Sequence, residues 1–443
     1  MRIAAVSLLA AVVLSLPALR AQTAAPADVD ARIAKLVESI SQSRMEQLLR
    51  TLAAFGTRNT LSDTSSPTRG IGAARQWILD EMQRSSAKLQ VSFDTHQIPK
   101  GGRITRDVEL RNIVAILPGQ SARRIYVSGH YDTVNLGARG QAALNTAAAG
   151  YGNPADNADA PGANDDGSGT VLVMELARAF AESGISFDAT LVFTAVAGEE
   201  QGLIGARAEA RAAKAAGTPV QAVFNNDIVG NSTGGDGIVD GATIRLYSEG
   251  PEDSPSRSLA IFTRRIAAQY VPSHRVRLMA RRDRFGRGGD HTAWNLEGFP
   301  AIGFRESREN YGKQHNANDT IDGVSFMYLA QNARVNAAAM AVLALAPPPP
   351  IVYNDRGAPT LDRRPSGYDA HLQWNASPGA SGYRIFWREA WAPDWQHELY
   401  VGNVTEYVMP HANVDDWVFG VAAVDADGHE STVSAYVAAP PNY

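Results

Sequence analysis

The sequence predicts an α/β domain with a mixed, mostly parallel sheet flanked by helices, followed by a small all-β sandwich at the C-terminus. Strand-like and helix-like segments alternate along most of the chain, as in folds built on a parallel sheet. Residues 189–197 are almost entirely apolar and favour β-structure, which indicates a strand covered on both faces in the middle of that sheet. Four prolines at 347–350 indicate the domain boundary, so we place the domains at 22–346 and 353–443 with a linker at 347–352.

The composition is that of a globular protein. The chain has 443 residues, of which 44% are hydrophobic and 20% charged, so it can bury a sizeable core. Its formal net charge of -5 gives no reason to expect nucleic acid as a partner. The chain contains no cysteine, so neither disulfides nor lipidation of a thiol is expected.

Residues 1–21 have the pattern of a secretory signal peptide. Arg2 precedes an apolar run from Ile3 to Leu19, and small residues follow from Ala21. A membrane anchor would need a longer uninterrupted apolar span. We therefore expect a secreted or periplasmic protein that is not stably inserted in a membrane once the signal has been removed.

The first domain supplies its elements in order. Helical spacing predicts amphipathic helices over 29–55 and 70–82, and alternation at period two predicts an antiparallel edge hairpin over 91–97 and 108–117. The remaining predicted elements are a strand at 125–129, a long loop at 133–162, a helix at 170–182, the apolar strand at 189–197, a helix at 205–216, a strand at 220–229, a helix at 256–270, a strand at 299–304 and a closing helix at 324–346.

The second domain has no helical period. Short alternating strands are predicted at 371–374, 383–388, 398–401 and 417–424, with turn signals between them. In size and pattern this segment resembles a fibronectin type III domain. Two interpretations stay open: the domain contacts a substrate, a polymer or a cell surface, or it is a spacer that packs on the first domain. The residues that decide between them are Trp387, Trp391 and Trp395.

Acids and imidazoles gather where the predicted strands end and in the loops that leave them. Ligands of open α/β sheets bind outside the carboxyl ends of the strands, so these side chains are expected to meet at one edge. Imidazole and carboxylate suit zinc, and a site with two metals needs a carboxylate that can bridge them. The residues are His130, Asp165, Glu199, Glu200, Asp227 and His315.

Glu199 and Glu200 are adjacent at the end of the apolar strand. Two neighbouring carboxylates repel each other, and the pair is tolerable when a cation holds one ionised while the other exchanges a proton. The pair therefore predicts a metal ligand beside a general base.

Five ordered motifs resemble the signature of the zinc aminopeptidases of peptidase family M28, and the resemblance covers about residues 40–346. It implies the zinc exopeptidase fold and two zinc ions per chain. The motifs are His130-Tyr131-Asp132, Asn164-Asp165-Asp166-Gly167-Ser168-Gly169, Gly198-Glu199-Glu200-Gln201-Gly202, Asp227, and His315 with Asp319-Thr320.

Carried over residue by residue, the resemblance implies a set of metal ligands. Asp165 would bridge the two zinc ions. His130 and Asp227 would complete the shell of one ion, and Glu200 and His315 that of the other.

The resemblance also implies catalytic and supporting roles. Glu199 would be the general base, and Asp132 would orient His130. The bond between Asp165 and Asp166 is expected to be cis, as in the family.

The chain departs from the family pattern in two places. Gln314 precedes the last histidine where the family has a tyrosine that helps to stabilise the tetrahedral intermediate, so turnover is expected to be lower. Gly288 to His291 stand where the family has Ser-Asp-His, and we expect Asp290 and His291 to support the site without binding metal.

The expected function is that of a metallo-aminopeptidase that removes N-terminal residues, with a preference for large apolar ones, from peptides or proteins. Three alternatives stay open. Glutaminyl cyclases share the fold but work with one zinc, and a dipeptidase or carboxypeptidase would need Arg305 or an arginine within 275–287 facing the carboxylate of the substrate. A non-catalytic peptide-binding protein would have no need of Glu199 as a base.

Overall fold

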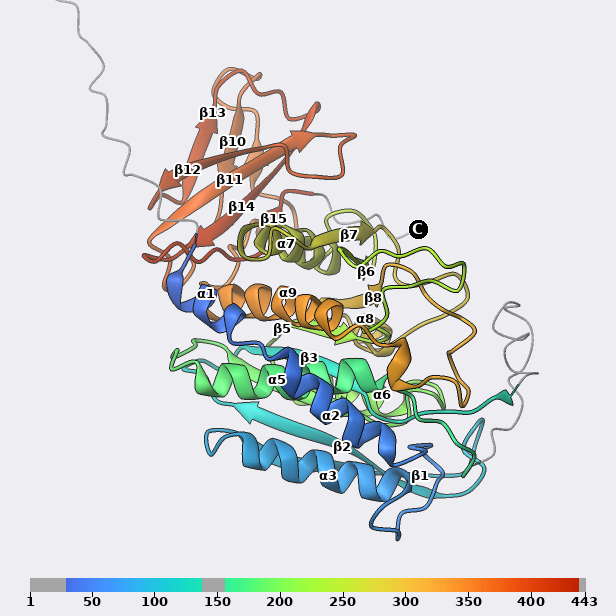
Figure 1. Ribbon diagram of the computed structural model, residues 1–443. Helices are drawn as coiled ribbons and strands as arrows, with labels where there is room; N and C mark the ends of the chain where they lie inside the picture. Colours follow the sequence, from blue (N-terminus) through green and yellow to red (C-terminus); the bar gives the residue numbers. More distant parts are fainter. Residues whose placement is uncertain (1–28, 138–155, 438–443) are drawn as a thin grey trace, which may run out of the picture.

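The computed structural model describes residues 29–137 and 156–437, and the predicted signal peptide lies outside these ranges. The chain forms a large α/β domain and a smaller β domain, drawn in orange and red in Figure 1. Within the described ranges, no helix is both long and apolar enough to span a membrane.

One sheet of eight strands organises the larger domain, with the strand order β1-β2-β4-β3-β5-β8-β6-β7. The inner strands β4, β3, β5 and β8 are parallel to one another, whereas β1, β2 and β6 join by antiparallel pairing. The sheet is therefore mixed, as predicted. The bounds are β1 Gln90–Ile98, β2 Val108–Leu117, β3 Arg124–His130, β4 Thr190–Val196, β5 Val220–Asn226, β6 Thr243–Ser248, β7 Arg275–Met279 and β8 Ala301–Glu306.

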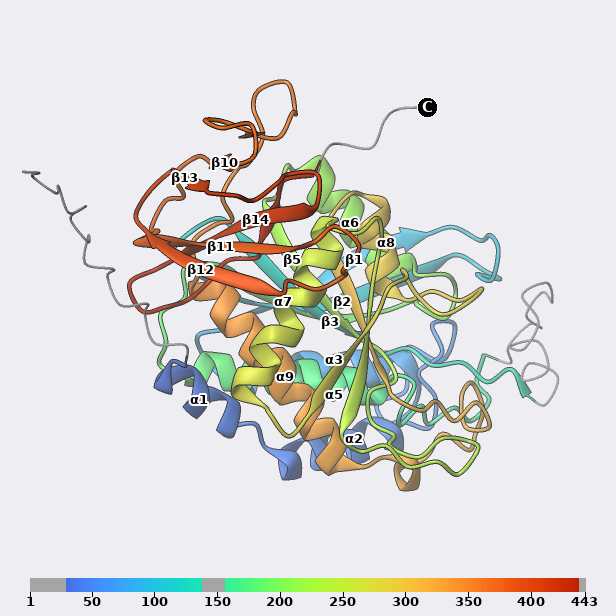
Figure 2. The same ribbon diagram turned by 90° about the horizontal axis from the view of Figure 1, so that it is seen from above.

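Helices cover both faces of this sheet (Figures 1 and 2). The larger hydrophobic core joins one face to α1, α2, α3, α5, α7 and α9, and a smaller cluster joins the other face to α6 and α8. Helix α9 is apolar on almost all sides because α1, α2, α5 and α7 surround it. The bounds are α1 Ala31–Glu38, α2 Gln42–Ala54, α3 Gly70–Ser85, α5 Gly167–Glu182, α6 Ile204–Ala215, α7 Pro255–Tyr270, α8 Asp290–Leu296, the 3₁₀ turn η1 Ile321–Gly323 and α9 Phe326–Leu345.

Two expectations about this domain need correction. The segment 29–55 forms two helices, because the Ser41 hydroxyl accepts a hydrogen bond from the Arg44 amide and so starts α2 anew. The apolar strand, β4, lies inside the sheet between β2 and β3, but β3 and β5 occupy its middle. Strands β6 and β7 and helix α8 were not predicted.

The C-terminal domain consists of two antiparallel sheets, β13-β10-β9 and β12-β11-β14-β15. A separate hydrophobic core, which includes Leu372, Trp374 and Phe419, lies between them. The bounds are β9 Leu361–Asp362, β10 Ala370–Gln373, β11 Gly382–Glu389, β12 His397–Gly402, β13 Glu406–Met409, β14 Trp417–Val424 and β15 Ser434–Ala435.

The tryptophans of this domain differ in exposure. Trp387 stacks on His397, and Trp395 packs against Phe386, so both have partners within the domain. Trp391 is 79% exposed. Of the three, only Trp391 presents most of its surface to solvent.

Ion pairs fix the C-terminal domain to the α/β domain along α7 and the start of α1. Arg265 of α7 pairs with Glu430, and its guanidinium lies 4.8 Å from the centre of the Phe386 ring. Arg388 pairs with Asp253 at 2.5 Å. Pro347 and Pro350 of the linker are buried, so the connection between the domains is packed.

We expect Asp253→Ala to lower the free energy of unfolding by about 3 kcal/mol, because Arg388 would keep a buried charge without its partner. The side chains of Arg388 and Asp253 are only 4% and 6% exposed. The double variant Asp253→Leu/Arg388→Met, which removes both charges, should recover most of the loss in chemical denaturation. A double variant as unstable as the single one would contradict this account.

His429 makes the contact between α1 and the C-terminal domain sensitive to pH. Its Nδ1 lies 2.6 Å from Asp425 Oδ2 and its Nε2 lies 3.0 Å from Asp30 Oδ2. Burial lowers the pKa of His429, but the two carboxylates outweigh burial and raise this pKa above its ordinary value.

Because the folded state binds this proton more tightly than the unfolded state, the contact stabilises the fold fully below about pH 6.5. Its contribution is lost as the pH rises through the raised pKa of His429. We expect the free energy of unfolding to fall as the pH rises above neutrality, and His429→Gln to flatten that part of the profile. An unchanged profile in the variant would show that His429 does not carry the effect.

Candidate metal centre

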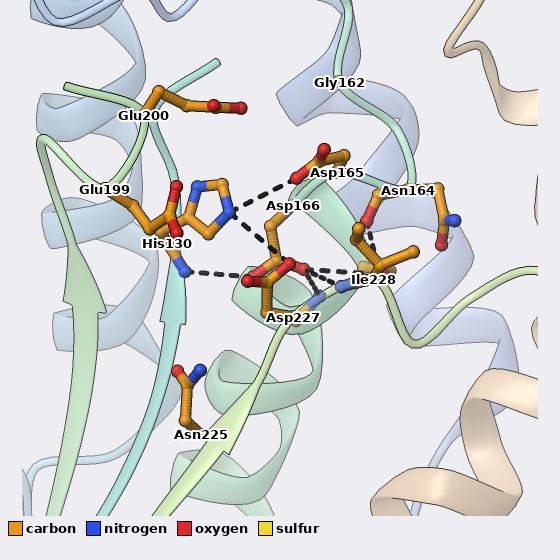
Figure 3. Close-up of polar contacts among 12 residues, drawn as sticks. His130, Gly162, Asn164, Asp165, Asp166, Glu199, Glu200, Asn225, Asp227 and Ile228 are labelled. Carbon is orange, nitrogen blue, oxygen red and sulfur yellow. Dashed lines mark hydrogen bonds and ion pairs between the residues drawn. The ribbon is translucent and has the colours of Figure 1, made fainter. Parts of the chain in front are cut away.

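The five predicted metal ligands meet at the carboxyl ends of the parallel strands. His130 ends β3, Glu200 and Asp227 follow β4 and β5, Asp165 lies just before α5, and His315 lies in the loop after β8. Figure 3 shows His130, Asp165 and Asp227 converging, with Glu199 and Glu200 beside them.

Asp165 is shared between two groups of ligands. Its Oδ1 lies 3.3 Å from His130 Nε2, which is also 3.7 Å from Asp227 Oδ1. Its Oδ2 lies 3.0 Å from His315 Nε2, which is also 3.3 Å from Glu200 Oε2. Each oxygen of Asp165 therefore faces a different histidine.

These residues fit zinc. Four of their buried polar atoms, one each from His130, Asp165, Glu200 and Asp227, have no hydrogen-bond partner among the described residues. Buried polar atoms are costly without partners, and a cation would supply one for each. The donors within each group lie within 4.8 Å of one another, and nitrogen and carboxylate oxygen are the ligands zinc prefers.

Asp166 ties three parts of the site together. The Asp165–Asp166 peptide bond is cis, as the family resemblance implied. The Asp166 carboxylate accepts hydrogen bonds from the amides of His130 at 3.0 Å, Ile228 at 3.1 Å and Gly169 at 2.9 Å. These bonds cap α5 and fix the ends of β3 and β5 relative to it.

Asp319 and Arg58 hold the loop that presents Asp165. The Asp319 carboxylate accepts hydrogen bonds from the amides of Asn164 at 3.0 Å and Asp165 at 2.8 Å. The buried guanidinium of Arg58 donates to the carbonyl oxygens of Tyr131 at 2.6 Å and Gly162 at 2.8 Å. Sequence reasoning missed Arg58, because a single arginine in a polar loop carries no signal of such contacts.

Asp132 positions more than the predicted His130. The His130 Nδ1 lies 3.1 Å from the main-chain oxygen of Asp132 and 3.6 Å from its carboxylate. That carboxylate accepts hydrogen bonds from the amides of Glu199 at 3.1 Å and Glu200 at 3.2 Å. Asp132 therefore holds both glutamates in place beside the histidine.

Glu199 has the proton affinity that a general base needs. Desolvation in the site raises the pKa of Glu199 to about 7, the nearby His130 opposes this rise, and Asp227 and Asp132 add to it. A carboxyl group with such a pKa exchanges protons near neutral pH.

Arg305 is fully buried and joins Asp227 to the loop before α8. It pairs with the Asp227 carboxylate and donates to its carbonyl at 2.9 Å, and on its other side it lies 3.5 Å from Asp283. Arg305 therefore does not face the substrate, as one alternative would have required. Asp290 and His291 are also buried and belong to none of the described metal groups.

A cavity of about 380 Å³ opens above this cluster. Its described lining includes Glu199 and four of the five predicted ligands, together with several arginines. Gln314, which replaces the family tyrosine, is buried beside it and bonds to Glu309 and Arg287, each at 3.2 Å.

Comparison with known proteins agrees with this geometry. Residues 112–340 match the model of peptidase family M28. A probable zinc metalloprotease from Leptosphaeria maculans is 37% identical over 434 residues, which cover 90% of this chain and 95% of the relative. The chain belongs to peptidase family M28. Another M28-like relative, a probable zinc metalloprotease from Pyricularia oryzae, is 37% identical over 91% of this chain and 84% of its own length.

Solved structures share the fold of this M28 chain at low sequence identity. The LapA aminopeptidase of Legionella pneumophila superposes with a TM-score of 0.54 at 20% identity over 74% of this chain and 78% of its own. A glutaminyl cyclase from Fimbriiglobus ruber superposes with a TM-score of 0.51 at 20% identity over 68% of this chain and 95% of its own. The M28 chain is thus a zinc metallopeptidase by family.

Proposed function

We propose that this M28 protein is an exported aminopeptidase with two zinc ions per chain. The observation that carries the proposal is the sharing of Asp165 between two ligand groups, one with His130 and Asp227 and one with Glu200 and His315. A carboxylate that faces two histidines with different oxygens suits a bridge between two cations. The apolar run that ends near residue 19 supports export.

The residues of the site would divide the work of hydrolysis. Zinc, when bound, would polarise the scissile carbonyl and lower the pKa of the attacking water. Glu199 would take a proton from that water as its oxygen bonds to the carbonyl carbon. Glu199 would then give the proton to the amine nitrogen as the carbon–nitrogen bond breaks. Asp132 would keep Glu199 in place through its amide.

The experiment is mass spectrometry of peptides that are free or blocked at each terminus, incubated with the purified protein with and without a chelator. Chelator-sensitive trimming from free N-termini alone would support the aminopeptidase. Trimming of N-terminally blocked peptides from the other end would reverse the polarity. Loss of ammonia from N-terminal glutamine, without cleavage, would favour a cyclase on the same fold.

A further inference from the structure

The cavity above the metal centre is rich in positive charge. Two of its arginines come from the β1–β2 connection and from α6, and two come from the loop between β7 and α8. Among the described lining residues, only Leu203 and Ile228 have sizeable apolar side chains. The four arginines are Arg103, Arg207, Arg284 and Arg287.

Two of these arginines are occupied by the protein itself. Arg103 donates to the main-chain oxygen of Glu200 at 2.6 Å. Arg284 is 8% exposed and pairs with Asp283 at 2.9 Å and with Glu309 at 2.8 Å. Both therefore shape the walls of the cavity.

Arg287 is only partly compensated. Its carboxylate partner is Glu309, at 3.2 Å, which also pairs with Arg245 at 2.6 Å and with Arg284. Burial raises the pKa of Glu309, but the arginines outweigh burial and lower it to about 2, so Glu309 is ionised. One negative charge is thus shared among three guanidinium groups, and Arg287 has the longest of the three contacts.

Arg207 lies exposed on the first turns of α6, where it reaches the same cavity. Among the described residues its side chain makes no ion pair or hydrogen bond. Arg207 and Arg287 therefore remain to meet a ligand from opposite walls of the cavity.

We propose that Arg207 and Arg287 select substrates that carry a carboxylate beside the scissile amide bond. This inference rests on the proposed function, because two bound zinc ions would offset the carboxylates of the metal centre and leave the arginines to set the charge of the cavity. A guanidinium group recognises a carboxylate through charge-assisted hydrogen bonds.

That carboxylate has two sources, the side chain of an N-terminal Asp or Glu and the terminal carboxylate of a dipeptide. The apolar preference expected from sequence would need an apolar pocket, and the described lining does not provide one.

The test compares kcat/KM of the zinc-loaded protein for matched substrates that differ in one charge. Glutamyl and glutaminyl 4-nitroanilides compare a charged with a neutral side chain of the same shape. Leucyl-leucine and leucyl-leucinamide compare a free with a blocked terminal carboxylate. We expect the charged member of at least one pair to be preferred by about tenfold or more.

The variants Arg287→Gln and Arg207→Gln should reduce this preference, with the larger loss for the less exposed Arg287. Arg287→Lys should retain part of it, because the charge stays. The controls are Arg211→Gln, one turn along α6 and outside the cavity lining, and Arg282→Gln in the same loop as Arg287. Both controls should keep the preference.

Each outcome decides the proposal. Cleavage of the neutral member of both pairs at least as fast as the charged one would overturn the inference and leave the metallo-aminopeptidase standing. A preference that survives in both Arg287→Gln and Arg207→Gln would also overturn it. Failure to cleave any peptide in the presence of zinc would overturn the proposed function and the inference together.

Discussion

Replacing Glu199 by Gln is expected to lower kcat by a factor of about 10³, because the amide cannot accept the proton of the attacking water. Glu199 belongs to the metal-binding edge of the sheet, yet it lies outside the two groups that share Asp165. The Gln variant should therefore keep its zinc content and its melting temperature. Kinetics on a leucyl 4-nitroanilide and metal analysis of the same sample would measure both.

Glu199→Asp is the matched control, since it keeps the carboxylate but moves it by one methylene. It should retain more activity than Glu199→Gln. Equal activity of Glu199→Gln and the unchanged protein would show that another group acts as the base, and loss of zinc from Glu199→Gln would show that Glu199 is a ligand.

Asp165→Asn is expected to reduce bound zinc from two ions per chain to one at most, and to abolish measurable turnover. The neutral amide is a poor bridge between two cations, and both ligand groups lose their shared member. In excess zinc the variant should also unfold more easily. A ligand at a thousandfold excess over its Kd stabilises a protein by about 4 kcal/mol, and this contribution would shrink.

Glu200→Gln separates bridging from ordinary ligation. It changes only the group that contains His315, so one zinc ion should remain with His130, Asp165 and Asp227. Inductively coupled plasma mass spectrometry on protein freed of loosely bound metal would count the ions. Two zinc ions per chain in Asp165→Asn would refute the bridging role.

The ligands of the metal centre could be predicted because each lies at the end of a recognisable strand or in a loop that leaves one. His130 and Asp227 follow apolar segments whose partners in the sheet are parallel, so topology alone brings them together. The supporting contacts could not be predicted. Arg58 bonds to main-chain carbonyls more than seventy residues away, and main-chain acceptors leave no mark on the sequence.

The missed strands have a physical reason as well. β7 alternates arginine with apolar residues at the edge of the sheet, where charged side chains are common, so its sequence resembles a solvated loop. The same bias hid the cavity, because the arginines after β7 are distinguished only by which carboxylates they meet in the folded chain.

The packed proline linker and the buried pair of Arg388 and Asp253 give the two domains one fixed relative placement. A flexible tether would raise the local concentration of any bound partner around the cleft, whereas a rigid joint holds it at one distance and orientation. A polypeptide held by the C-terminal domain would reach the zinc edge only if its free end were long enough. The small domain would then act as a ruler, sorting chains by length before the cavity sorts them by charge.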